Sequence, residues 1–270
     1  MKQIYGSRNW SKLWTKLEQS GNIGIDYCIN PVLYPKICNQ LNTADNAHVV
    51  DFGAGTNMLA IQFLFGNEKT VPALQSCQQL DNARKNVRKF TGIEQSPDLV
   101  KEAEKYRQEL ELPDKVEIQK MHLTSENKLP FECSSINLAV SRNFLMHLSI
   151  KDLSFHFDEV SHVLKRNGKY IFAILNPDYE QKKHRESNNG CDLKNGQRYS
   201  FEHGNNGENG RFYHYYKTAD QYETIFNKHF EIVDKKACTP ISDEFKSTHE
   251  RYYWADCPMS YTYELRKCDD

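Results

Sequence analysis

An acidic residue followed closely by two glycines is the first pattern in this sequence with chemical consequences. In "HVVDFGAGTNMLA", residues 48–60, Asp51 stands where an apolar run ends, and Gly53 and Gly55 follow it. Glycines at such a turn let a ligand approach the backbone, because no Cβ stands in the way. The dinucleotide fingerprint G-x-G-x-x-G/A instead places a pyrophosphate at a helix N-terminus, and a carboxylate there would repel it. The pattern therefore favours a cationic ligand that carries no phosphate.

Two histidines follow other apolar segments and could accept protons. His147 lies in "SRNFLMHL" and His214 in "RFYHYYKTADQY", and His203 is a weaker third candidate. Three tyrosines surround His214: Tyr213, Tyr215 and Tyr216. Imidazole is the usual general base near neutral pH. His147 either supports its loop or takes part in chemistry, and His214 either lies on an exposed aromatic strand or orients an acceptor above the tyrosines.

Short apolar runs alternate with helical spacings through the middle of the chain, and these elements must position the candidate residues. The strands are expected at 47–52, 90–94, 116–120, 136–141 and 169–175. The helices are expected at 57–65, 78–88, 97–110 and 150–166. Such alternation is typical of an α/β fold with a parallel sheet and helices on both faces. Ligands of that fold bind beyond the carboxyl ends of the strands, where Asp51 stands.

The segments on either side of this core differ from it in composition. Residues 1–44 show helical spacing of Trp10 and Trp14 and a second helical run after Pro31, which predicts an N-terminal helical cap. Residues 45–177 form the expected core. In 178–270, the stretch up to about 210 is rich in Gly and Asn and predicts a long exposed loop or lid. A strand, a helix and two further strands then complete the same sheet.

Four segments, taken in order, resemble the class I S-adenosylmethionine-dependent methyltransferases of the small-molecule type. They are "VVDFGAGT", "GIEQSPDLVKEAEK", "LPF…INLAVSRNFLMHL" and "FDEVSHVLKRNGKYIFAI", within about residues 45–176. The resemblance implies a Rossmann-like, doubly wound, mostly parallel sheet with an N-terminal cap and a polar lid after the fifth strand. It also implies S-adenosyl-L-methionine as the cofactor and S-adenosyl-L-homocysteine as the product. This cofactor carries an ammonium and a sulfonium group and no phosphate, as the acidic turn requires.

The resemblance also implies which residues contact the cofactor. Glu94, at the end of the second strand, is expected to bind the ribose hydroxyls, with Asp81 as a rival because the insertion 66–89 delays this acid. Asn57 stands where the family often has a third glycine, and Asn also tolerates unusual backbone angles. The expected cofactor contacts are Tyr27, Asp51, Gly53, Ala54, Gly55, Glu94, Gln95, His122, Leu123 and Ser141.

Composition limits the partners. The formal net charge is -1, and no stripe of Arg or Lys with aromatic residues is present, so we expect no nucleic-acid partner. The eight cysteines include no C-x-x-C pair and no zinc spacing, so we expect no metal and free thiols. No signal segment or membrane span is apparent, which predicts a cytoplasmic protein without a membrane partner.

Methyl transfer to an oxygen or nitrogen of a small aromatic or apolar metabolite is the function that this pattern favours. A neutral amine attacks with its lone pair, whereas a phenol gains much from a base. Three alternatives stay open: the same fold acting on a protein or RNA, a cofactor-binding member without activity, and a nicotinamide-dependent dehydrogenase. The sequence leaves the acceptor, the methylated atom and the oligomeric state open.

Overall fold

A seven-stranded sheet forms the centre of the computed structural model, which describes residues 25–67, 70–205, 208–238 and 257–268. The strand order is β3-β2-β1-β4-β5-β9-β8. The strands are β1 (Ala47–Phe52), β2 (Val87–Glu94), β3 (Val116–Lys120), β4 (Ile136–Arg142), β5 (Leu164–Leu175), β8 (Phe230–Cys238) and β9 (Ser260–Lys267). Only β9 runs against its two neighbours, so the predicted Rossmann-like, mostly parallel sheet is confirmed. The order reverses between β1 and β4, where such sheets bind ligands.

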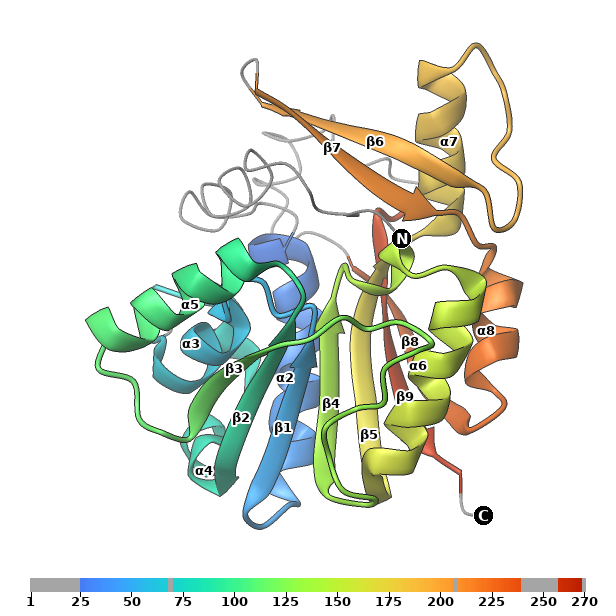
Figure 1. Ribbon diagram of the computed structural model, residues 1–270. Coiled ribbons are helices and arrows are strands. Elements are labelled where there is room, and N and C mark those ends of the chain that lie inside the picture. Colours follow the sequence, from blue (N-terminus) through green and yellow to red (C-terminus); the bar gives the residue numbers. More distant parts are fainter. Residues whose placement is uncertain (1–24, 68–69, 206–207, 239–256, 269–270) are drawn as a thin grey trace.

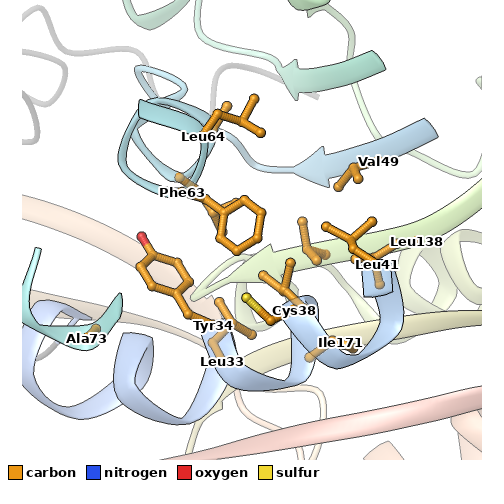
Figure 2. Packing of buried hydrophobic residues seen from close by; sticks show 14 of the residues in the cluster. Leu33, Tyr34, Cys38, Leu41, Val49, Phe63, Leu64, Ala73, Leu138 and Ile171 are labelled. Carbon is orange, nitrogen blue, oxygen red and sulfur yellow. The ribbon is translucent and has the colours of Figure 1, made fainter. Parts of the chain in front are cut away.

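Helices cover both faces of this sheet (Figure 1). One face packs against α2 (Asn30–Asn42) and α3 (Met58–Phe65), and Figure 2 shows Tyr34 and Cys38 of α2 beside Phe63 of α3. The other face packs against α6 (Ile150–Val163) and α8 (Ala219–Phe226). All six residues of β1 are buried because both faces are covered. Burial of each large apolar side chain in these layers contributes about 1.5–3 kcal/mol.

The insertion before β2 folds onto α2. It contains the short helix η2 (Pro72–Ser76) and α4 (Leu80–Asn86), and both contact α2. The π-turn η1 (Ile25–Ile29) leads into α2, and α5 (Pro97–Glu109) follows β2. The predicted helix before residue 25 lies outside the described residues.

The segment after β5 differs from the sequence-based expectation. It forms α7 (Pro177–Ser187) and an antiparallel hairpin of β6 (Arg198–Asn205) and β7 (Glu208–Tyr215), so the expected long exposed loop is wrong. Asn176 caps α7 by accepting a hydrogen bond from the Asp178 amide at 3.0 Å, with Pro177 in the first turn. Aromatic side chains replace the missing aliphatic ones, and a small cluster contains Leu193, Tyr199 and Tyr216. Figure 1 shows α7 and the hairpin above the end of β5, in the position of a lid.

Three element boundaries also differ from the sequence-based expectation. α6 ends at Val163 and β5 begins at Leu164, whereas the sequence suggested a helix to 166 and a strand from 169. β2 likewise begins at Val87, before the expected start at 90. Within the described ranges, no helix combines the length and the apolar character needed to cross a membrane.

Candidate active site

The turn after β1 is shaped by backbone angles that favour glycine. Gly53 has a φ of 71° and Gly55 a φ of 59°, both in the left-handed region, and Asn57 follows with a φ of 64°. The amides of Gly53 and Ala54 donate to the carbonyl oxygen of Ile93 at 2.9 and 3.1 Å, so the turn lies against the end of β2. The tolerance expected of Asn57 for an unusual angle is confirmed.

Two carboxylates lie at this turn. Asp51 is 1% exposed and pairs in register with Val140 of β4 on one side and Gly92 of β2 on the other. Glu94, the last residue of β2, accepts hydrogen bonds from the amides of Gly55 at 3.0 Å and Ser96 at 2.8 Å. Burial raises the pKa of the Glu94 carboxyl above its ordinary value, and these amide bonds oppose the rise.

The rival acid lies elsewhere. Asp81 occupies the first turn of α4, its side chain is 91% exposed, and it approaches Arg84 at 4.0 Å. Glu94 therefore is the acid that stands with the glycine turn at the carboxyl ends of the central strands. The insertion delays this acid along the chain without moving it from the sheet edge.

The two carboxylates suit a cationic ligand that also carries hydroxyl groups. An anionic side chain at the end of β1 can attract an ammonium or sulfonium group, and a carboxylate at the end of β2 can accept bonds from neighbouring hydroxyls. Ala54 is buried inside the turn and Gln95 is half-buried beside Glu94. Asp51 and Glu94 would hold S-adenosylmethionine by these two ends.

Residues 73–172 match the family model described as a methyltransferase domain. Residues 73–172 therefore contain a methyltransferase domain, and the sheet that carries it has the fold of the class I S-adenosylmethionine-dependent methyltransferases. S-adenosylmethionine is therefore the cofactor. The match contains Glu94 and the strands β2 to β4 and most of β5, and it begins after the glycine turn.

Solved structures of low sequence identity share the fold of this methyltransferase. An S-adenosylmethionine-dependent methyltransferase of Clostridium acetobutylicum is 14% identical, with 95% of this chain and 96% of that chain covered and a TM-score of 0.57. A methyltransferase of Methanosarcina mazei is 17% identical, with 88% and 99% covered and a TM-score of 0.56. The [4+2]-cyclase SpnF is 16% identical, with 89% and 81% covered and a TM-score of 0.55. Among curated proteins, none matches the chain.

Ser141, another expected cofactor contact, has its side chain inside the core. Ser141 is fully buried, and its hydroxyl bonds to the Tyr170 hydroxyl at 3.0 Å, which in turn lies 3.0 Å from Nε2 of His156. The side chain of Ser141 therefore takes part in a polar chain beneath the turn. The sequence does not single out Tyr170 and His156, because each lies within an apolar pattern and no spacing marks it.

The residues that follow β3 lie at the same carboxyl edge of the sheet as Glu94. His122 is exposed, and Leu123 is half-buried against the α6 side of the core. The Met121 amide donates to the carbonyl oxygen of Glu94 at 2.9 Å, which fixes this segment beside the second carboxylate. The expected contacts of His122 and Leu123 with the cofactor stay a prediction. The side chains of Tyr27 and His203 lie outside the described residues, as do Trp10 and Trp14.

The loop after β4 connects the glycine turn to the lid. Phe144 packs against Gly53 so closely that a Cβ at Gly53 would lie 2.7 Å from its ring carbons. The loop then forms the short helix η3 (Leu145–His147). Nδ1 of His147 lies 3.0 Å from the carbonyl oxygen of Tyr213 in β7. Burial and the neighbouring His214 lower the pKa of His147 to about 3, so its ring is neutral near pH 7.

His214 lies in a buried polar cluster that the sequence did not reveal. Its Nδ1 lies 3.0 Å from Oε1 of Glu180 in α7, and its ring centroid lies 4.9 Å from that of His147. The Tyr199 hydroxyl of β6 donates to the same Glu180 oxygen. The structure therefore brings the two predicted histidines together and adds Glu180 and Tyr199 to them.

The three tyrosines near His214 do not share one face. Side chains alternate along a strand, so Tyr213 and Tyr215 project to the side of β7 opposite to His214. Tyr213 and Tyr215 are half-buried, and the Arg198 guanidinium lies 4.1 Å from the Tyr213 ring centroid. Tyr216 is buried with Tyr199. A single acceptor pocket lined by all three stays a prediction.

A buried lysine connects the end of β7 to the loop after β4. Nζ of Lys217 donates to the carbonyl oxygens of Leu148 at 2.8 Å and Tyr215 at 2.7 Å, and no part of its side chain is exposed. Burial lowers the pKa of Lys217 to about 7, and the negative charge of Glu180 opposes this. In the described part of the chain, no group of three His, Cys, Asp or Glu side chains could hold a metal ion.

Proposed function

We propose that this methyltransferase transfers the methyl group of S-adenosylmethionine to an oxygen or nitrogen of a small aromatic or apolar molecule. The observation that supports it best is the lid of α7, β6 and β7 above the carboxyl end of the sheet (Figure 1). The bond between His147 and the Tyr213 carbonyl fastens this lid to the loop after β4. A covered edge of this kind suits an acceptor small enough to be enclosed.

The residues of the chain have separable tasks in this proposal. When bound, the cofactor supplies an electrophilic methyl group on a sulfonium sulfur. Asp51 attracts the positive end of the cofactor, and Glu94 accepts bonds from its ribose hydroxyls. The lid and the Phe144 loop align the acceptor and exclude water, which is most of what transfer from an activated sulfonium requires.

The charge of the protein supports a small acceptor over a nucleic acid. The formal net charge is -1, so there is no global field that would draw a polyanion to the site. A protein or RNA acceptor would also have to reach an edge that α7 and the hairpin overlie. Both remain outcomes of the test below.

Calorimetry followed by a methyl-transfer assay tests the proposal. The protein should bind S-adenosylmethionine and S-adenosylhomocysteine, and labelled methyl groups should pass to members of a panel of small phenols, hydroxyl compounds and amines. Asp81→Asn serves as the matched control for Asp51→Asn, because Asp81 is the exposed acid away from the turn. Transfer only to protein or RNA, or cofactor binding without transfer to any acceptor, would reject the small-molecule proposal.

A further inference from the structure

A cluster of ionisable side chains is buried where the lid meets the loop after β4. Glu180 of α7 is 2% exposed, His214 of β7 is 5% exposed and Tyr199 of β6 is 7% exposed. Each comes from a different element of the lid. His147 of η3 lies beside His214, with the two rings edge to face. The cluster therefore adjoins the segment that contacts the cofactor turn.

The hydrogen bonds of this cluster determine the tautomer of His214. A carboxylate only accepts hydrogen bonds, so the 3.0 Å contact with Glu180 requires a hydrogen on Nδ1 of His214. The Tyr199 hydroxyl donates to the same oxygen, and burial and the Glu180 charge raise the pKa of Tyr199, which keeps it protonated. In neutral His214 the lone pair is consequently on Nε2.

Burying a carboxylate and an imidazole costs free energy, because both groups lose their contacts with water. A buried carboxylate needs hydrogen-bond partners, and an apolar cluster of similar volume would stabilise the lid at least as well. The charged and titratable groups that face the pair include Tyr199 from β6, His147 from η3, Tyr216 and Lys217 after β7, and Tyr222 from α8. The pair itself combines an imidazole, which can accept a proton, with a carboxylate that can orient the ring.

We propose that His214 is the proton acceptor of the transfer reaction, that Glu180 is its positioning residue, and that the methyl acceptor is therefore a hydroxyl or phenol. This inference rests on the proposed function and narrows its substrate class. A neutral amine needs no base before attack, whereas a phenol near pKa ~10 does.

The methyl-transfer step conserves atoms and electrons. The acceptor oxygen forms a bond to the methyl carbon with one of its electron pairs, while the carbon–sulfur bond breaks and its electron pair stays on sulfur as a neutral thioether. The hydroxyl proton passes to Nε2 of His214. The imidazolium that forms is stabilised by the Glu180 carboxylate at Nδ1, and the proton then leaves to solvent. No oxidant, reductant or further reactant takes part.

The tautomer can be measured without turnover. In cofactor-free protein with ¹⁵N-labelled histidine, the His214 signals, assigned through His214→Gln, should show a hydrogen on Nδ1 and a lone pair on Nε2 at a pH where the ring is neutral. A spectrum with the hydrogen on Nε2 would overturn the proposal, since the nitrogen nearest Glu180 would then be the acceptor.

Kinetics of matched variants test the chemical role. Glu180→Gln keeps the shape of the side chain and should lower kcat for a hydroxyl acceptor roughly 10- to 100-fold, while His214→Gln should lower it roughly 100-fold or more. Cofactor affinity and KM should change by no more than about twofold, and the acid limb of the pH–rate profile should move to lower pH in Glu180→Gln. A structural role alone would not move that limb.

Two controls separate chemistry from lid stability. Tyr199→Phe removes a donor to Glu180 but keeps the charge, so it should lower the melting temperature and leave the acid limb in place. Glu264→Gln alters another largely buried carboxylate, which bonds Lys36 and Lys169 far from the lid, and should leave kcat unchanged. If Glu180→Gln behaves as Tyr199→Phe does, the positioning role is wrong.

The failure of this inference differs from the failure of the proposed function. Turnover of amines alone, unchanged by Glu180→Gln, would reject the hydroxyl acceptor and the base while leaving small-molecule methyl transfer in place. Absence of cofactor binding in the wild-type protein would reject both, and calorimetry reports it before any variant is compared.

Discussion

Replacing Gly53 by alanine should destabilise the protein more than the same change at any glycine that has only an unusual backbone angle. Gly53 has a φ of 71°, and the left-handed region costs a residue with a Cβ about 1–2 kcal/mol. The new Cβ would also lie 2.7 Å from two ring carbons of Phe144 and 2.8 Å from its Cβ. Overpacking of this kind costs a further ~1–3 kcal/mol, so we expect a total of about 2–5 kcal/mol.

Gly190 provides the matched control. It has a φ of 79°, yet a Cβ built on it would meet no heavy atom within 4 Å. Gly190→Ala should therefore cost only the backbone part, about 1–2 kcal/mol, or a few degrees in melting temperature for a chain of this size. Thermal unfolding of both variants measures the difference, and calorimetry should show at least tenfold weaker cofactor binding for Gly53→Ala alone. Equal destabilisation of the two variants would refute the close packing of Phe144 on the turn.

Further predictions concern the carboxylates and the buried histidines. Asp51→Asn should weaken S-adenosylmethionine binding about 10- to 100-fold in calorimetry, as loss of a charge-assisted bond implies, whereas Asp81→Asn should leave it unchanged. Glu94→Gln places an amide NH2 where backbone donors point, so we expect about 1–3 kcal/mol lower stability in denaturant unfolding and weaker cofactor binding; unchanged values would reject its bonds to the turn. Burial lowers the pKa of three histidines from 6.5, to about 4 for His48 and about 3 for His147 and His156. These rings stay neutral in the folded state but accept protons when unfolded, so stability present above pH 6.5 should fall as the pH drops toward 4, by up to about 1.4 kcal/mol per pH unit for each ring. His156→Leu should reduce that slope by about one proton, and an unaltered slope would contradict its neutral burial.

The sheet edge could be predicted from the sequence because its geometry follows from strand ends. Asp51 and Glu94 each end an apolar run, and the carboxyl ends of neighbouring parallel strands meet at one edge. Neither the insertion nor the unusual spacing of Glu94 disturbs this relation, since the extra residues fold as η2 and α4 against α2. Local pattern and sheet topology were sufficient here.

The lid could not be predicted in the same way, because polar and aromatic contacts build its interior. Glu180 lies in "PDYEQKKHRES", a charged segment typical of a solvated helix face, and its partners follow 19 and 34 residues later. Which of the carboxylates in this segment turns inward depends on how α7 docks against the hairpin. A local signal for α7 itself was present in Asn176 and Pro177, which form a capped helix start.

The loop after β4 joins the parts that could be predicted to the part that could not. Asn143 enters it with a φ of 51° and donates its amide to the carbonyl oxygen of Ala173, which directs the chain over the sheet edge. Phe144 then covers Gly53, His147 contacts the Tyr213 carbonyl, and the Leu148 carbonyl accepts from Lys217. The loop from Asn143 to Leu148 thus contacts the cofactor turn through Phe144 and the lid through His147 and Leu148. The backbone that places Phe144 on the cofactor turn therefore also places His147 beside His214, so one short loop sets the position of both side chains.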